Sequence, residues 1–340
     1  MKYGVTLAAV PGSQLRGVYA KKAQDAGFDT AWTDDNPASD GIVHMSAMAA
    51  AAPGIRVGSG ILRAFLRNPV TVASSYLTMN ALTERGVILG IATGTKLQNM
   101  YQYGIDVPRP IHRLRTVIAM VRGFWAAVEA GETFRWEDEY YQIRGIRAVR
   151  SDRAVMRPIP IWIAAVNENM QRFAGEVADG LCGHPTVGAD YLRDVVRPNI
   201  DAGRAKSDYD APFEFGVWAT TVVHPDKAVA RHLAGQTIAN YLSTKSYQGI
   251  LRYYGIGDRY EAIRKAVLTD RDLDRASRLI GDDVIERIAI TGPADEVREE
   301  LTRRYVGVAD QVIVASGGSL GETPQDRLRT IDAVVRAPLE

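Results

Sequence analysis

Two adjacent aspartates, Asp34 and Asp35, follow the short apolar segment Thr30–Thr33. Adjacent like charges in front of Asn36-Pro37 are typical of a solvated turn. The apolar segment before them, however, is typical of a buried strand, and several folds keep their catalytic residues at strand ends. The sequence therefore leaves three interpretations of the pair open: a turn, half of a metal site, or acids that face a cofactor.

A metal site needs several convergent histidine or carboxylate ligands. The chain has five histidines, and none of them shows the H-x-H or H-x-x-H spacing that brings two ligands together. Among the histidines, only His184 lies in a candidate segment at a strand end, and Asp34 and Asp35 point to opposite sides of an extended chain. We therefore expect no metal site. The single cysteine, Cys182, excludes an internal disulfide and a cysteine-based zinc cluster.

The residue types also argue against catalysis through a covalent intermediate. Cys182 lies inside a predicted strand, where a small core residue is a better interpretation than a nucleophile. No lysine after Lys2 stands within a predicted strand, so a Schiff-base mechanism has little support. Because the protein offers no strong catalytic group of its own, we expect a bound cofactor to carry the reaction.

Two glycine-containing segments at predicted strand ends suit a flat, phosphorylated ligand. The segment VGSGILRAF places Gly58 and Gly60 where a strand ends, and this allows a bulge or a close approach of the backbone to a ring. The segment GIATGTK, Gly90–Lys96, leaves another strand through small residues. Turn geometry alone explains any single glycine, but two such segments on neighbouring strands favour the ligand.

The elements that must position these residues alternate between strand and helix. Alternation of this kind predicts a parallel sheet, and eight units predict a closed (β/α)8 barrel. A doubly wound sheet is the second choice, because AAVPGSQLRG after the first predicted strand lacks the glycine-rich fingerprint of that fold. The predicted strands are Lys2–Leu7, Thr30–Thr33, Arg56–Ile61, Val87–Ile91, Ile159–Ala165, Gly180–Cys182, Phe213–Val223 and Gln311–Ser316.

Two segments depart from this alternation. The residues Thr133–Ile143 alternate like a β-hairpin, and residues 226–290 are largely helical, which predicts a helical insertion after the seventh strand. A last helix is expected over Thr323–Val335, and we expect a single domain over residues 1–340. In a barrel, ligand-binding residues lie at the carboxyl ends of the strands. The candidate segments are therefore 34–36, 60–67, 92–98, 165–169, 183–185 and 316–320.

Composition limits the partners of the protein. A hydrophobic content of 46%, a charged content of 24% and a formal net charge of +1 are those of a soluble globular protein, so nucleic acid is not an expected partner. No apolar run approaches the roughly 18 residues that a membrane span needs. The first residues read better as a strand than as a signal peptide, because Gly4 and Pro11 interrupt the apolar stretch. We expect a cytoplasmic protein with a small-molecule substrate.

The motifs at these strand ends resemble those of a known family of enzymes. The segment GSGILRAFLRNPVTVASSYLTMNALTERGVILGIATGT, followed further on by IPIWIAAVNENMQRFAGEVADG, is similar to the bacterial-luciferase-like superfamily of flavin and deazaflavin enzymes. Members share a strand, a bulge, R-x-P, a helix and L-G-I-x-x-G, and later P-I-x-I-A-A, a helix and A-D-G. The segments ANYLSTKSYQGILRYYG, DDVIERIAITGPADEVREELTRRY and AGEVADGLCGHP further resemble a subfamily of oxidoreductases that depend on the deazaflavin coenzyme F420.

The resemblance implies a (β/α)8 barrel with insertions, assembled as a homodimer, with a cis peptide bond between Gly60 and Ile61 that backs the cofactor ring. It implies that Asp34 faces the cofactor and that Asp35 donates or accepts a proton beside the ring. His184 is expected on the substrate side. The cofactor-binding residues that the resemblance implies are Asp34, Gly60, Ile61, Arg63, Thr93, Gly94, Gln98, Ala165, Val166 and Asn167.

The chain departs from the family pattern at three places. Asp35 stands where members often have a histidine. Thr95 stands where members often have a carboxylate that serves as a catalytic acid. The segment Ala165–Asn167 stands where glycines usually bind the phosphate. The general rule for barrels would instead put a phosphate near the seventh and eighth strands, at SGGSLG, residues 316–321. We favour the placement at Ala165–Asn167.

The predicted function is an oxidoreductase that transfers a hydride between F420 and a small organic substrate. An activated C=C or C=N bond or an alcohol is the expected reacting group. Two alternatives stay open: an FMN-dependent monooxygenase of the same superfamily, and a barrel that binds a flavin without turnover.

Overall fold

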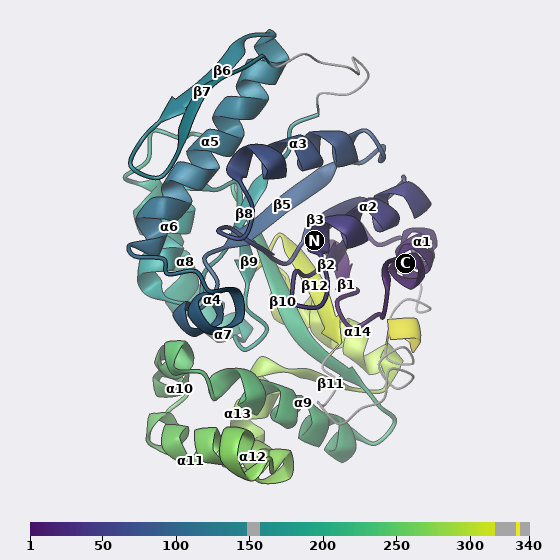
Figure 1. The fold of residues 1–340 in the computed structure, drawn as a ribbon. Helices are drawn as coiled ribbons and strands as arrows, with labels where there is room; N and C mark the ends of the chain where they lie inside the picture. The colour runs from purple at the N-terminus through teal and green to yellow at the C-terminus, as the bar shows by residue number, and fades with distance from the viewer. Residues whose placement is uncertain (148–156, 317–330, 334–340) are drawn as a thin grey trace.

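The computed structural model describes residues 1–147, 157–316 and 331–333, so most of the helix expected over Thr323–Val335 lies outside the described residues. Eight parallel strands close into a barrel, which confirms the predicted (β/α)8 fold (Figure 1). The barrel strands in spatial order are β1 (Lys2–Thr6), β2 (Thr30–Thr33), β3 (Arg56–Ser59), β5 (Val87–Ala92), β8 (Ile161–Ala164), β9 (Gly180–Gly183), β10 (Glu214–Val223) and β12 (Gln311–Ser316). Strand β10 pairs with β9 and β12, and β12 pairs with β1, so the barrel closes.

Helices surround the barrel, and two of them, α2 and α3, begin after residues whose side chains cap them. Asp40 accepts hydrogen bonds from the first N–H groups of α2, and Asn68 does the same for α3, whose first residue is Pro69. The surrounding helices are α1 (Ser13–Asp25), α2 (Gly41–Ala51), α3 (Pro69–Asn80), α5 (Pro110–Ala130), α6 (Glu168–Val177), α7 (Ala189–Tyr191), α8 (Arg197–Arg204) and α14 (Ala294–Tyr305).

The insertions follow the predicted pattern. The antiparallel hairpin β6 (Thr133–Glu137) and β7 (Gln142–Arg147) lies beside α5, and a layer of helices follows β10 at the bottom of Figure 1. A short strand, β4 (Leu62–Arg63), follows β3 and pairs with β5, and a short helix, α4 (Lys96–Tyr103), follows β5 in the chain. The helices after β10 are α9 (Lys227–Leu242), α10 (Gln248–Tyr253), α11 (Tyr260–Lys265), α12 (Leu273–Ile280) and α13 (Asp282–Ile288).

Two short strands were not predicted, β4 and β11. After the inserted helices, β11 (Ile290–Gly292) pairs in parallel with the end of β10, beyond the part of β10 that pairs with β9. Three residues are too few to show an alternating pattern in a sequence. This strand ties the insertion to the end of the barrel.

Three indole rings fill the inside of the barrel. The ring of Trp32 lies 5.2 Å from that of Trp162 and 4.8 Å from that of Trp218. Trp32 and Trp162 have no exposed surface. The rings pack with Ile88, Cys182 and Ile313 into a cluster separate from the main core between barrel and helices.

Glycines on the strands make room for these rings. A Cβ atom at Gly58 would lie 2.4 Å from Trp32, and one at Gly216 would lie 2.2 Å from Trp162. A Cβ at Gly60 would lie 2.7 Å from Trp218. The sequence predicted that the backbone at Gly58 and Gly60 approaches a ring, and the rings found there are tryptophan side chains of the protein itself. The peptide bond between Gly60 and Ile61 is cis, as the resemblance implies.

We expect Gly216→Ala to lower the free energy of unfolding by about 1–3 kcal/mol, because the added methyl group meets Trp162 in a filled interior. The control is Gly249→Ala in α10, where the nearest atom to the new Cβ is Arg252 Nη2 at 3.9 Å. The control should keep or raise stability, by up to about 1 kcal/mol. Urea unfolding followed by circular dichroism measures both. Equal losses in the two variants would contradict this packing.

Candidate active site

The end of the barrel where the carboxyl ends of the strands lie, here called the mouth, has an apolar floor. Ile61 lies two residues after the end of β3, Ala164 ends β8, and Ala315 stands near the end of β12. All three pack on the tryptophan cluster and stay partly exposed. A flat apolar ring therefore has a surface at the mouth on which it can rest.

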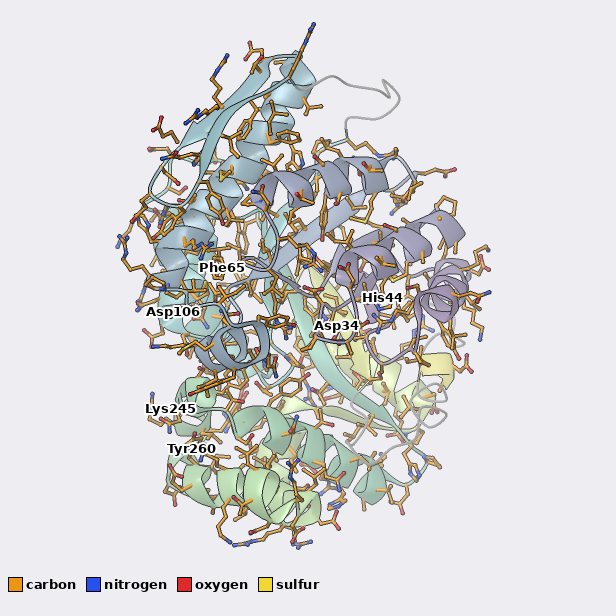
Figure 2. The ribbon with its side chains drawn as sticks, viewed as in Figure 1. Asp34, His44, Phe65, Asp106, Lys245 and Tyr260 are labelled. Atoms are coloured by element: carbon orange, nitrogen blue, oxygen red, sulfur yellow. The ribbon has the colours of Figure 1, made fainter. Side chains whose placement is uncertain are left out.

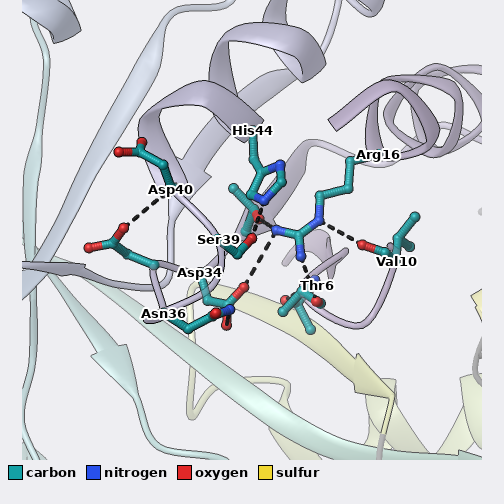
Figure 3. A network of polar contacts seen from close by, with 12 residues as sticks. Thr6, Val10, Arg16, Asp34, Asn36, Ser39, Asp40 and His44 are labelled. Carbon is teal, nitrogen blue, oxygen red and sulfur yellow. Dashed lines mark hydrogen bonds and ion pairs between the residues drawn. The ribbon is translucent and has the colours of Figure 1, made fainter. Parts of the chain in front are cut away.

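Asp34, directly after β2, is held at the mouth by a buried arginine of α1. Arg16 is 4% exposed, and its Nη1 lies 3.5 Å from Asp34 Oδ1 and also bonds Thr33. Its other nitrogens donate to the carbonyls of Val10 at 2.7 Å and Ala8 at 2.8 Å. Arg16 thus joins the chain after β1 to the end of β2 (Figure 3). The side chain of Asp34 keeps 32% exposure.

His44 of α2 supports the same loop (Figures 2 and 3). Its Nδ1 lies 2.8 Å from Ser13 Oγ, and its Nε2 bonds the hydroxyl of Ser39. Ser39 pairs with Asn36 through both backbone groups, and Asn36 Nδ2 donates to Asp34 Oδ2 at 3.3 Å. Burial lowers the pKa of His44, which favours the neutral form of the ring.

Asp35 belongs to a different network. Arg67 binds its two carboxylate oxygens at 2.9 Å each, and the backbone N–H of Gly41 donates to it at 3.0 Å. The same guanidinium donates to Asp40 at 2.7 Å. The hydrogen bond to Asp35 is the largest cause that raises the pKa of Arg67, and the contact with Asp40 adds to it. Asp35 is only 6% exposed. The two adjacent acids therefore face different partners, as expected for neighbours on an extended chain.

His184, directly after β9, is fixed by the next turn. Its Nδ1 accepts from the backbone N–H of Thr186 at 3.3 Å and lies 2.7 Å from the Thr186 hydroxyl, so the proton of the neutral ring is on Nε2. Burial lowers the pKa of His184 to about 3. The ring contacts two tyrosines of the insertion: Tyr241 at 4.9 Å, edge-on, and Tyr247 at 4.7 Å between centroids.

The segment after β5 is built around the start of α4. Thr95 and Gln98 form a capping box, in which Gln98 N donates to Thr95 Oγ1 at 3.2 Å and Thr95 N donates to the Gln98 amide oxygen at 3.4 Å. Gly94 has φ of 67°, and Thr93 donates to the Gly94 carbonyl at 3.0 Å. Arg63 reaches Tyr103 at the end of α4. The amide oxygen of Gln98 thus already accepts a hydrogen bond within the capping box at the start of α4.

The segment Ala165–Asn167 connects β8 to α6. Ala165 is buried, and the carbonyl of Val166 accepts from the fully buried Gln171 at 3.0 Å. Asn167 is the N-cap of α6 but makes no capping bond with its side chain. The first N–H groups of the helix therefore lack that partner and point away from the helix. The competing segment at residues 316–321 lies almost wholly outside the described residues.

The structure brings Asp34, the floor and the loop at His184 to one end of the barrel, and it adds residues that the sequence reading missed. Arg16 and His44 hold the Asp34 loop, and Tyr241 and Tyr247 cover His184. The tyrosines lie in ANYLSTKSYQGILRYYG, a segment that the resemblance had already singled out. Cys182 is buried, and burial raises the pKa of its thiol well above the usual value, which disfavours a thiolate nucleophile.

The described residues contain neither a cluster of metal ligands nor a membrane-spanning helix. No three or more His, Cys, Asp or Glu side chains in residues 1–147, 157–316 and 331–333 come together as metal ligands. Within the same residues no helix combines the length and the apolar character needed to cross a bilayer.

The pKa of His184 predicts how stability changes with pH. An unfolded histidine has a pKa near 6.5, whereas the folded value is about 3, so between these values the unfolded chain binds a proton that the folded chain does not. The free energy of unfolding should fall as pH drops through this window, by at most about 1.4 kcal/mol per pH unit. His184→Asn should show a shallower fall in urea titrations, and an unchanged slope would contradict the assignment.

Comparisons with known proteins show which proteins the chain is similar to. The profile of the family described as luciferase-like monooxygenase matches residues 14–311. The 5,10-methylenetetrahydromethanopterin reductase of Archaeoglobus fulgidus is 26% identical over 93% of this chain and 93% of its own. The F420-dependent glucose-6-phosphate dehydrogenase of Amycolatopsis mediterranei is 26% identical over 54% of this chain and 57% of its own.

A solved structure extends the likeness to the fold. The coenzyme F420 dependent tetrahydromethanopterin reductase of Methanopyrus kandleri superposes with a TM-score of 0.77 at 21% identity, over 98% of this chain and 97% of that chain. At this identity the likeness concerns the fold. The family profile covers most of the chain, including every barrel strand from β2 to β10. The chain therefore belongs to the luciferase-like monooxygenase family.

Proposed function

We propose that the protein is an oxidoreductase that moves a hydride between coenzyme F420 and a small organic substrate. The observation that carries this proposal is the apolar floor of Ile61, Ala164 and Ala315, partly exposed at the end of the barrel where catalytic residues collect. The F420-dependent relatives support F420 in preference to FMN. An activated C=C or C=N bond or an alcohol is the reacting group that hydride transfer suits.

The donor set of the mouth fits such a coenzyme. The ring would lie against Gly60 and Ile61, with Asp34 at its edge and Thr93 and Gly94 beside it. Arg63 and Gln98 would contribute from the side of α4. The loop Ala165–Asn167 would hold a phosphate at the start of α6, where the N-cap side chain makes no bond of its own. When bound, the deazaflavin supplies a carbon centre that gives or takes a hydride and reacts poorly with oxygen.

The protein's own residues then have to orient the ring and move one proton. Asp34 is suited to contact the coenzyme, because its side chain is 32% exposed and Arg16 and Asn36 hold it only at 3.5 and 3.3 Å. We retain Asp35 as the group that moves the proton, with Arg67 fixing its carboxylate. His184 stays neutral at pH 7, since its pKa is about 3, and it therefore acts as a hydrogen-bond donor through Nε2.

The choice of coenzyme has a direct test. We expect the purified protein to bind F420 at least about tenfold more tightly than FMN, a difference of about 1.4 kcal/mol, in parallel fluorescence titrations. Turnover with reduced F420 should proceed without oxygen consumption. Tighter binding of FMN, with oxygen uptake coupled to substrate hydroxylation, would transfer the assignment to a monooxygenase. Binding of F420 without turnover of any substrate tested would favour a binding protein.

The two aspartates should respond differently to substitution. Asp34→Ala should mainly weaken F420 binding. Asp35→Asn should leave F420 binding near normal and slow turnover by about 10²-fold or more, the usual scale for losing a positioned acid or base. Since Asp35→Asn also weakens the contact with Arg67, circular dichroism must show that the variant is folded at the assay temperature. A folded Asp35→Asn variant with normal turnover would remove this residue from the chemistry.

A further inference from the structure

One fully buried amide side chain lies behind the loop that connects β8 to α6. Gln171 of α6 has no exposed surface. Its Nε2 donates to the carbonyl of Val166 at 3.0 Å, and its backbone N–H donates to the carbonyl of Asn167 at 2.9 Å. One residue therefore holds two consecutive carbonyls of the loop, and the bond from its side chain is additional to the regular bonds of the helix.

The position of the Val166 carbonyl sets the direction of the next N–H group. Within the described residues only the bond between Gly60 and Ile61 is cis, so the peptide unit that joins Val166 to Asn167 is trans. In a planar trans unit the C=O and the N–H point in opposite directions. Because Gln171 holds the Val166 oxygen toward the interior, the N–H of Asn167 is directed away from it.

The N–H of Asn167 is free to bind a ligand. It has no hydrogen-bond partner in the part of the chain that the structure describes, and Asn167 is exposed. The loop Ala165–Asn167 carries no charged side chain, and Arg172 binds the carboxylate of Glu168 at 2.8 Å. An anion at this loop finds no cation in it and depends on N–H groups, so the direction of these groups decides how well the anion is bound.

A second amide fixes the orientation of Gln171. Asn199 of α8 donates through Nδ2 to Gln171 Oε1 at 3.1 Å and to the carbonyl of Val195 at 2.8 Å. The carbonyls of Val195 and Val166, at the two ends of this chain of bonds, can only accept. Each amide must therefore present its nitrogen to a carbonyl, which leaves the Gln171 oxygen for Asn199. The bond from Gln171 to Val166 cannot be reversed without losing the others.

The two helices that carry these amides are in close contact. Helices α6 and α8 lie side by side (Figure 1). A Cβ at Gly175 would lie 2.1 Å from the carbonyl oxygen of Ile200, and one at Gly203 would lie 1.9 Å from that of Arg172. Since the helices meet backbone to backbone at these glycines, the distance between them is set by rigid atoms. Asn199 is thereby kept within hydrogen-bond reach of Gln171.

We propose that Gln171 is a positioning residue for the coenzyme phosphate and that Asn199 holds it in that role. Gln171 binds the Val166 carbonyl from behind the loop and so directs the N–H of Asn167 to the phosphate. Gln171 is fully buried and acts on the phosphate only through this peptide unit. The inference rests on the proposed function, in which the coenzyme phosphate lies at Ala165–Asn167.

The test uses two probes that differ only in the phosphate: the F420 deazaflavin with a 5′-phosphate on its ribityl chain, and the same deazaflavin without it. Gln171→Met keeps the length of the side chain and removes its hydrogen bonds. We expect this variant to bind the phosphorylated probe about three- to tenfold more weakly than the wild type does, which corresponds to the loss of one hydrogen bond. The affinity for the other probe should stay within about twofold, so the ratio of the two affinities falls.

Two further variants separate positioning from stability. Asn199→Ala should lower the same ratio, by about two- to fivefold, because it frees the Gln171 amide. The matched control is Asn80→Leu, since Asn80 is also a fully buried amide that donates to a carbonyl at 3.0 Å, that of Arg157, and it accepts from Val87 at the amino end of β5. The control should lose stability in urea unfolding and keep the wild-type ratio of affinities.

A measurement on the wild-type protein needs no variant at Gln171. In protein labelled with ¹⁵N-asparagine, the backbone amide resonance of Asn167 should shift more with the phosphorylated probe than with the other. The resonance is assigned by its absence in Asn167→Ser. Equal shifts with both probes would overturn the proposed role of Gln171, because the N–H that it directs would then not meet the phosphate.

The remaining outcomes distinguish this role from the proposed function. An unchanged ratio in a folded Gln171→Met variant, or an equal fall in Asn80→Leu, would overturn the positioning role while F420 binding stands. If Gln171→Met does not fold, Asn199→Ala and the Asn167 resonance decide. Failure of F420 to bind would refute the proposed function, and FMN with riboflavin would then supply the same ratio for Gln171. Failure of FMN as well would refute both proposals.

Discussion

The packing of three indole rings inside the barrel is the constraint on which the rest of the site depends. Trp32, Trp162 and Trp218 lie 4.8 to 5.2 Å apart in contacting pairs and leave no room for a Cβ at the facing strand positions. The strands therefore carry glycine there, and the upper surface of the cluster becomes the apolar floor of Ile61, Ala164 and Ala315. A ligand at the mouth rests on a filled barrel and cannot enter it.

The polar groups above this floor are held by two separate networks. Arg16 is buried and binds four groups in the chain after β1 and at the end of β2, among them Asp34. Arg67 binds Asp35 through both oxygens and extends to Asp40, which also starts α2. Adjacent carboxylates can lie in one turn because each has its own guanidinium. The turn interpretation and the functional interpretation of the pair are therefore compatible.

The local features of the fold could be read from the sequence. The strands, the hairpin near Thr133 and the helical insertion after β10 all show a periodicity that neighbouring residues determine. The sequence predicted that Gly58 and Gly60 lie at a strand end. It did not predict that these glycines face tryptophans, because Trp32 and Trp218 come from other strands. Their partners depend on barrel register, which single-sequence patterns do not contain.

The same reason explains what was missed at the site. Arg16 looks like an ordinary charged residue of α1, and nothing near it in the chain predicts burial against residues of two loops. Tyr241 and Tyr247 meet His184 across more than fifty residues of chain, and strand β11 is too short to detect. The contacts between the insertion and the barrel could therefore not be predicted from the sequence, although the resemblance had singled out the segment that contains the two tyrosines.

The most direct measurement is a crystal structure of the protein with F420 bound. A deazaflavin site at the mouth predicts a ring that rests on Ile61 and Ala164 above Trp218, with Asp34 at its edge and the phosphate at the start of α6. The open face of the ring should then lie toward His184 and Tyr241. A ring bound away from this floor, or a phosphate held elsewhere than at Ala165–Asn167, would contradict the site described above.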